Sequence, residues 1–141
     1  MPSVFTRILE GDLPGHVVWK DDICFAILSI HPLRKGHTLL IPREEFDHWL
    51  DMPAEVSGHL FAAAPVLGRA LFKAFEPVKV GLMIAGLEVP HAHVHLVPID
   101  DLRDLDFGNA QADVDHDELN QAARAIRSAL RSAGRREVCD E

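Results

Sequence analysis

Several features are scarce in this chain of 141 residues, and each scarcity excludes a class of protein. Only two cysteines are present, Cys24 and Cys139, and they lie far apart. No disulfide framework is therefore expected, and a reducing cytoplasm fits this cysteine usage. No apolar run approaches the length that spans a bilayer, and the N-terminal segment lacks the apolar core of a signal peptide. We therefore expect a cytoplasmic protein without a membrane partner.

Basic residues are also scarce relative to acidic ones. The chain has 14 lysines and arginines against 22 aspartates and glutamates, which gives a formal net charge of -8. A general nucleic-acid-binding protein needs a basic face that meets the phosphates, so nucleic acid is not an expected partner. One small anionic ligand in a locally positive pocket remains compatible with this charge.

The length and composition indicate a single domain over residues 1–141. Hydrophobic residues make up 48% of the chain and charged residues 26%, as in ordinary globular proteins. The chain is long enough for one domain with a substantial core and too short for two of usual size. No internal repeat or low-complexity linker divides it.

Three helices are expected from capping residues and apolar spacing. Ser3 is expected to cap a short helix over residues 4–10. Asp51 and Pro53 are good start signals for a long helix, whose apolar residues recur at helical spacing as far as Phe75. Asp115 is expected to cap a last helix over residues 116–132.

Five strands complete the predicted α+β fold with its antiparallel sheet. They are expected over residues 16–19, 24–30, 37–41, 78–84 and 92–97. Residues 44–50 are expected to form one or two helical turns. Residues 100–115 are acidic and without a clear period, so they are expected to form a surface loop. Arg34 and Lys35 are expected in a solvated loop, with steering of a phosphate as the alternative.

Three histidines, His91, His93 and His95, alternate in one short segment. Residues two apart in a strand share a face, so three imidazoles are expected on one surface. Imidazole ligates metals, donates hydrogen bonds or attacks as a nucleophile near neutral pH, so the row indicates a metal site, a phosphate site or nucleophilic catalysis. A three-histidine zinc site is one alternative, although the outer pair would lie about 13 Å apart at the backbone. A row of structural, buried histidines is another.

This row and an upstream Gly36-His37 pair resemble the histidine triad (HIT) superfamily. The order of segments is also similar, with a Phe-x-x-Ile start at residues 5–8, two strands, Gly-His, a long helix and then Val-Pro-His at residues 89–91. The resemblance covers residues 3–99 and leaves residues 100–141 as a C-terminal extension. Because the C-terminal region shapes the pocket in related proteins, a lid is the alternative to a surface loop for residues 100–106. It implies a HIT-like fold with a five-stranded antiparallel sheet and one long helix, beside the C-terminal helix. It also implies a homodimer formed by joining sheets.

The resemblance further implies an enzyme, namely a nucleotide hydrolase or nucleotidyl transferase that acts at the α-phosphate. A nucleoside phosphate or a related small phosphate ester is then the expected partner, with no cofactor. His93 would be the nucleophile and would carry a transient nucleotidyl group. His91, His95 and His37 would hold its tautomer, neutralise phosphate charge and protonate the leaving group, since such donors stabilise a phosphoryl centre. The alternative is a binding or sensor module for a nucleoside phosphate that turns over poorly.

The substrate-binding residues are also implied by the resemblance. In the Hint-like branch of the family, a hydrophobic slot for the base corresponds here to Phe5, Ile27, Ile30 and Leu39. The residue that grips the ribose hydroxyls corresponds to Ser29, where the family has an acid or an amide. A serine makes one hydrogen bond there instead of a bidentate pair.

Two further positions depart from the family pattern. Many members have a hydroxyl residue on the phosphate shortly before the triad, and here the position is Glu88. A carboxylate pointing inward would repel a phosphate unless protonated, so Glu88 either points outward or selects a substrate with a nearby cation. Several members hold zinc through Cys-x-x-Cys and a downstream histidine, and the matching positions are Ser3, Thr6, and Glu45 or Phe46. Because such a zinc site needs thiolates, no metal is expected.

Overall fold

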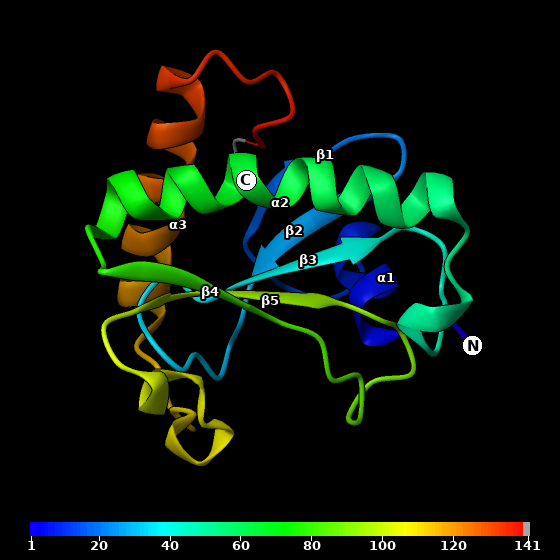
Figure 1. Ribbon diagram of the computed structural model, residues 1–141, viewed down its shortest axis with the longest axis horizontal. Coiled ribbons are helices and arrows are strands. Elements are labelled where there is room, and N and C mark those ends of the chain that lie inside the picture. Colours follow the sequence, from blue (N-terminus) through cyan, green and yellow to red (C-terminus); the bar gives the residue numbers. More distant parts are fainter. Residues whose placement is uncertain (140–141) are drawn as a thin grey trace.

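A five-stranded antiparallel sheet forms the centre of the computed structural model, which describes residues 1–139 (Figure 1). The strand order is β1-β2-β3-β5-β4. The strands are β1 (Val17–Lys20), β2 (Cys24–Leu28), β3 (Thr38–Pro42), β4 (Lys79–Met83) and β5 (Val94–Ile99). The helices are α1 (Val4–Leu9), α2 (Ala54–Phe75) and α3 (His116–Ser132), with short 3-10 turns η1 (Trp49–Asp51), η2 (Leu102–Leu105) and η3 (Phe107–Asn109). The predicted α+β fold is confirmed, and among residues 1–139 no helix is long and apolar enough to cross a membrane.

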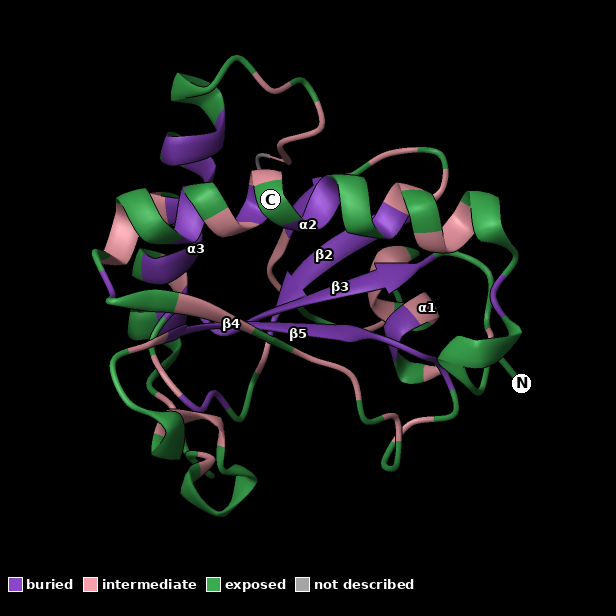
Figure 2. Ribbon diagram, in the orientation of Figure 1, coloured by how far each residue is buried: buried purple, intermediate pink, exposed green. Residues whose placement is uncertain are grey.

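The central strands are buried on both faces because helices cover each side. Every residue of β2 and β3 is buried, whereas no residue of β4, at the sheet edge, is buried (Figure 2). Helix α2 packs on one face through an apolar cluster that includes Leu40, Leu67 and Leu96. Helix α1 covers the other face, where Phe5 packs in a second cluster with four strand residues, Phe25, Ile27, Leu39 and Ile41.

Cross-strand pairing places the histidine region on the face that α1 covers. Ile27 pairs with Leu39 across β2 and β3, and Leu39 pairs with His95 across β3 and β5. Directly opposed residues of antiparallel strands share a face, so the His95 side chain lies beside the cluster around Phe5. The histidine face of the sheet is therefore the side opposite α2.

Gly36 explains why a glycine precedes His37. Its backbone is left-handed, with φ of 93°, which favours glycine. In addition, a Cβ at this position would overlap the ring of Phe75 at the end of α2. The bare backbone thus lets the loop close against α2 and deliver His37 to the start of β3.

Three local predictions are corrected. The strand expected over residues 92–97 is β5, which begins only at Val94, because the Ala92 N–H donates to the Phe46 carbonyl (2.6 Å) and not to a neighbouring strand. Residues 44–50 do not form one or two α-helical turns, since the 3-10 turn η1 starts at Trp49. Residues 100–115 are not merely loop, since they contain η2 and η3.

Asp21, in the turn between β1 and β2, ties that hairpin to α2. One carboxylate oxygen accepts the N–H groups of Ile23 and Cys24, both at 2.8 Å, and the other meets His59 Nε2 of α2 at 2.8 Å. Burial opposes the charge, but the hydrogen bonds from His59 and the backbone lower the pKa of Asp21 to about 2. Burial and the neighbouring carboxylate raise the pKa of the Cys24 thiol, so it stays protonated and donates to Asp21 at 3.4 Å. This cluster is a structural hydrogen-bonded link.

Candidate active site

His93 is buried just before β5, and its tautomer is fixed by the backbone. Its Nδ1 lies 2.8 Å from the carbonyl oxygen of His91. A carbonyl only accepts, so Nδ1 carries the hydrogen and Nε2 keeps the lone pair. Among residues 1–139, no protein group is hydrogen-bonded to that Nε2. Burial lowers the pKa of His93, which keeps the ring neutral near pH 7.

His95, His37 and the Leu33 backbone form a line of hydrogen bonds with one direction. The Leu33 N–H donates to Nδ1 of His37 (3.0 Å), so Nε2 of His37 carries the hydrogen. That Nε2 lies 2.9 Å from Nδ1 of His95 and donates to it. The remaining hydrogen of a neutral His95 is therefore on Nε2. Burial lowers the pKa of His37 to about 3 and that of His95 to about 4, so both rings are neutral near pH 7.

His91 lies on the face that α1 covers, as His93 does, since their ring centroids are 5.7 Å and 4.8 Å from that of Phe5. Both residues precede β5, so the three alternating histidines do not all lie within one strand. Both ring nitrogens of His91 are engaged by other groups. Nε2 donates to the Pro42 carbonyl at 2.7 Å, so Nδ1 is an acceptor for the Ser3 hydroxyl at 2.6 Å. A zinc ion bound by all three histidines does not fit these bonds. The carbonyl of His91, more than its ring, holds the tautomer of His93.

The N-terminal end of α1 is tied to His91 by a polar cluster. Ser3 caps α1 as predicted, and its hydroxyl also bonds His91. The Glu45 carboxylate accepts the Thr6 hydroxyl at 2.6 Å and the Ser3 N–H at 3.0 Å. The Thr6 hydroxyl and the Ser3 amide lower the pKa of Glu45. Phe46, the other position considered, packs against the apolar core instead.

Two phenylalanines flank the histidine rings. The centroid of Phe5 lies 4.8 Å from that of His93 in an edge-to-face arrangement. The His93 and His95 centroids are also 4.8 Å apart, and Phe107 of η3 lies 5.0 Å from His95, again edge-to-face. Phe107 was not expected here, because residues 100–115 carry no periodic pattern that would place it.

The residues predicted to bind substrate separate into buried and exposed groups. Phe5, Ile27 and Leu39 are buried together in one apolar cluster, whereas Ile30 is 60% exposed. Ser29 is half-buried, with its N–H on the His37 carbonyl (3.0 Å) and its hydroxyl accepting from the His31 N–H (3.2 Å). Nothing in these bonds marks Ser29 as a ribose ligand.

Glu88 is exposed in the loop before His91. Its negative charge nevertheless reaches His93 and raises the pKa of that ring, against the larger effect of burial. The Glu88 side chain is therefore not buried among the histidines.

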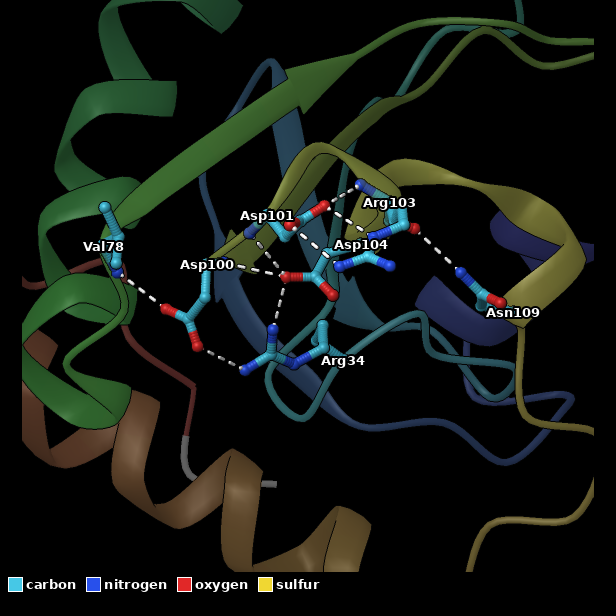
Figure 3. A network of polar contacts seen from close by, with 7 residues as sticks. All are labelled: Arg34, Val78, Asp100, Asp101, Arg103, Asp104 and Asn109. Atoms are coloured by element: carbon cyan, nitrogen blue, oxygen red, sulfur yellow. Dashed lines mark hydrogen bonds and ion pairs between the residues drawn. The ribbon is translucent and has the colours of Figure 1, made fainter.

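Arg34 pairs with acidic residues of the C-terminal extension. Its guanidinium lies 2.6 Å from Asp104 and 3.1 Å from Asp100 (Figure 3). Lys35 is exposed.

The other histidines lie outside the site: His16 contacts the His116 ring, His31 bonds the Gln111 carbonyl, His48 caps η1 and His59 bonds Asp21.

Comparison with known proteins identifies the family of this chain. Residues 10–102 match the family model described as the HIT domain. An adenylylsulfatase of Arabidopsis thaliana is 30% identical over 100 residues, which is 67% of this chain and 51% of the relative. An adenosine 5'-monophosphoramidase of Saccharomyces cerevisiae is 26% identical over 129 residues, which is 90% of this chain and 82% of the relative.

A solved structure is similar over nearly the full length. The zinc-bound histidine triad family protein from Mycobacterium smegmatis superposes with a TM-score of 0.79 at 28% identity, covering 93% of this chain and 94% of that one. Residues 10–102, which match the family model, include the Gly36-His37 pair and all three alternating histidines. The chain belongs to the HIT family.

Proposed function

We propose that this protein is a nucleotide hydrolase or nucleotidyl transferase that acts at the α-phosphate through a nucleotidyl-His93 intermediate. The observation that carries the proposal is the fixed tautomer of His93, whose Nδ1 hydrogen is held by the His91 carbonyl. That bond leaves the Nε2 lone pair available to attack phosphorus. The names of the adenylylsulfatase and the monophosphoramidase among the relatives support an adenylyl substrate.

The proposed reaction has two displacements. In the first, the lone pair of His93 Nε2 forms a bond to phosphorus, and the bond to the leaving atom breaks with its electron pair. In the second, water or an acceptor hydroxyl attacks phosphorus, the N–P bond breaks and its electrons return to Nε2. The attacking water loses one proton, which balances any proton taken up by the leaving group. His95 Nε2–H donates to a phosphate oxygen as negative charge grows there.

The low pKa of His93 matters for the first displacement. A neutral imidazole is needed for attack, and burial lowers the pKa of this ring below the usual 6.5. At any pH between 6 and 7, the fraction of neutral His93 in the free protein should therefore exceed that of an unperturbed histidine.

A zinc ion does not fit the positions of this chain that correspond to the zinc ligands of several family members. The groups there are the Ser3 and Thr6 hydroxyls and the Glu45 carboxylate, with no thiolate. Zinc sites of the expected kind need thiolates, and these hydroxyls already donate to His91 and Glu45. The residues present do not fit the ion, so the proposed mechanism uses only the side chains and backbone of this chain.

We also propose that two copies pair along β4. This strand lies at the edge of the sheet, where backbone N–H and C=O groups on its outer side can hydrogen-bond to another strand. Exposed apolar side chains of Phe72, Val78 and Leu82 lie on and beside it. A groove of about 420 Å³ lies between α2 and β4, lined by residues that include Phe72 and Val78. A second copy of the chain would cover this apolar surface.

The hydrolase proposal is tested by trapping the intermediate. Wild-type protein and a His93→Ala variant are mixed with adenosine 5'-phosphosulfate or adenosine 5'-phosphoramidate, quenched, and analysed by denaturing mass spectrometry. The wild type should gain the mass of one adenylyl group, and His93→Ala should lose at least about 1,000-fold in turnover. The exposed His48→Ala variant serves as the control and should behave as wild type. Unchanged turnover in His93→Ala would contradict the proposal, and saturable AMP binding without adduct or turnover would favour the binding module.

A further inference from the structure

The hydrogen-bonded link between the β1–β2 turn and α2 also brings three different metal-ligating groups together. Asp21, Cys24 and His59 each have one ligand atom (a carboxylate oxygen, the thiol sulfur and an imidazole nitrogen) within 4.8 Å of those of the other two. His59 Nε2 lies 2.8 Å and Cys24 Sγ 3.4 Å from the same atom, Asp21 Oδ2. In the part of the chain that the structure describes, no other group of three histidine, cysteine or acidic side chains meets this distance.

The cluster lies on the sheet face that α2 covers. Cys24 starts β2 and belongs to the apolar cluster on which α2 packs. His59 is near the start of α2, and Asp21 is in the turn before β2. His93 lies on the opposite face, beside α1. A ligand held by this cluster would therefore lie outside the proposed active site.

The distances between the three groups suit a tetrahedral zinc ion. Zinc binds cysteine sulfur at about 2.3 Å and histidine nitrogen or carboxylate oxygen at about 2.0–2.2 Å. At tetrahedral angles, these lengths put the sulfur about 3.6 Å and the nitrogen about 3.4 Å from the oxygen. Cys24 Sγ already has nearly that separation, and His59 Nε2 would move outward by about 0.6 Å. The ring has room for this movement, because the His59 side chain is 35% exposed.

Asp21 Oδ2 receives more donors than it has lone pairs. The indole N–H of Trp19 donates to it at 3.0 Å, beside the His59 ring and the Cys24 thiol. A carboxylate oxygen has about two lone-pair sites, so three donors compete for them. One metal ion would replace the donors from His59 and Cys24 by a single bond and leave the second site to Trp19. This crowding favours an ion over hydrogen bonding alone.

The surrounding groups hold the carboxylate in place and set the type of ion. Oδ1 of Asp21 accepts the backbone N–H groups of Ile23 and Cys24, both at 2.8 Å, and such bonds orient a ligand. Arg43 donates from Nε to the Asp21 backbone carbonyl at 2.6 Å, so it braces the turn and not the carboxylate. Magnesium and calcium prefer oxygen ligands alone, whereas a thiolate with an imidazole is typical of zinc. A thiolate and a carboxylate together neutralise a divalent ion.

We propose that Asp21, Cys24 and His59 bind one zinc ion that joins the β1–β2 hairpin to α2. Three protein ligands leave a fourth position for water. The ion replaces the Cys24 thiol proton, and the hydrogen of a neutral His59 ring moves from Nε2 to Nδ1. At least one proton is therefore released for each ion bound. The expectation of no metal was drawn from the family positions at the start of α1 and does not bear on this cluster.

Zinc binding to the full chain, first stripped with a chelator, tests the proposal. Calorimetry with zinc chloride in two buffers of different ionisation enthalpy should give one ion and at least one released proton per chain. His59→Gln, which keeps a donor for Asp21, and Cys24→Ser should each weaken binding by about 10-fold or more. His48→Gln and Cys139→Ser are the matched controls and should bind zinc as wild type does.

Two further measurements identify the ligands and check the fold. Cobalt(II) should give the wild type a thiolate-to-metal charge-transfer band in the near ultraviolet, and Cys24→Ser should lack it. Zinc should raise the thermal unfolding temperature of the wild type but not that of His59→Gln. Unfolding without zinc shows whether each variant is folded. If Cys24→Ser does not fold, His59→Gln decides the matter, because its side chain lies at the surface of α2.

The proposal stands apart from the nucleotidyl-His93 mechanism. A wild type that binds no stoichiometric zinc would overturn it, as would undiminished binding in folded His59→Gln. Loss of zinc binding in His93→Ala, with binding retained in His59→Gln, would place the ion on the histidine face and overturn it as well. None of these results changes the adduct-trapping experiment, which uses no metal.

Discussion

Ser3 illustrates how one hydroxyl serves two elements. It caps α1 by accepting the Thr6 N–H at 3.2 Å, and it donates to the buried Nδ1 of His91 at 2.6 Å. The His91 carbonyl in turn holds Nδ1 of His93. The position of the proposed nucleophile thus depends on a residue that does not contact phosphorus.

Replacing Ser3 by alanine should therefore affect both stability and turnover. The change leaves the buried His91 Nδ1 without a donor and removes a helix cap, which should lower the free energy of unfolding by about 1–3 kcal/mol. Turnover should fall by about 10-fold with little change in KM, because the reacting geometry is disturbed more than binding. Urea unfolding and steady-state kinetics measure the two effects. Ser3→Thr, which keeps the hydroxyl, should restore most of each, and wild-type behaviour of Ser3→Ala would contradict the role assigned here.

The secondary-structure elements differ in how far the sequence predicts them. Helix α3 was predicted with its observed bounds, because Asp115 is a strong cap and the apolar stripe is regular. The central strands were predicted within two residues at most of their ends. The two-residue delay in the start of β5 and the positions of the 3-10 turns depend on contacts with distant segments, such as the bond from Ala92 to Phe46. Such contacts cannot be predicted from the conformational propensities of neighbouring residues.

The candidate site was likewise predicted in part, where local motifs determine it, and missed where distant contacts do. The His93 and His37 positions follow from short motifs, and a glycine before His37 is explained by its left-handed backbone. Phe107 could not be predicted, because its place depends on a chain reversal held by Arg34 and by packing on Gly81. The predicted base slot illustrates a third case, since the apolar residues were identified but their burial required the packed structure.

The Arg34 pairs are expected to control the mobility of residues 100–109 more than overall stability. Exposed ion pairs contribute about 0–1 kcal/mol, and Arg34 is 37% exposed at its side chain. Arg34→Gln should therefore lower the free energy of unfolding by less than about 1 kcal/mol while amides of residues 100–109 exchange hydrogen faster. Hydrogen exchange with mass spectrometry measures this. Arg103→Gln is the matched control, because Arg103 pairs only locally with Asp101 among the described contacts; equal exchange in the two variants would contradict an anchoring role for Arg34.

For the molecule as a whole, the buried neutral histidines should make folding sensitive to mild acid. Burial lowers the pKa of His37 to about 3 and of His95 to about 4, while an unfolded histidine has a pKa near 6.5. The unfolded chain then binds more protons than the folded one below pH 6.5. The contribution of these rings is therefore complete above that pH and is lost as the pH falls toward 4.

Urea unfolding at pH 7.5, 6 and 5 measures this dependence. The free energy of unfolding should fall by about 4 kcal/mol across that range, with about 2 kcal/mol from each ring. Asp21, whose pKa is lowered to about 2, contributes stability that is lost only below about pH 4. Its titration therefore does not change the free energy of unfolding between pH 7.5 and 5. A His95→Asn variant should show a shallower fall. Equal stability at pH 7.5 and 5 would contradict the assignment of neutral, buried rings.

The proposed pairing along β4 makes a prediction about mass in solution. Phe72 is 50% exposed in the single chain, so Phe72→Lys should leave the folded monomer intact while placing a charge in the proposed interface. Light scattering at micromolar concentration should give a dimer for wild type and mostly monomer for Phe72→Lys. Leu87→Lys, at a 93% exposed position in the loop before His91, should remain dimeric. A monomeric wild type would contradict the pairing.

The line from the Leu33 amide through His37 to His95 has a consequence for leaving groups. An amide N–H keeps its proton and cannot become an acceptor, so it opposes a second proton on Nδ1 of His37. An extra proton on the two rings would have to face this amide or break the bond between the rings. The pair can therefore donate a hydrogen bond to phosphate from His95 Nε2. Because the two rings seldom carry an extra proton, they seldom supply one to a leaving group. Groups that depart as stable anions, such as sulfate, should leave more readily than amines, which must be protonated on departure.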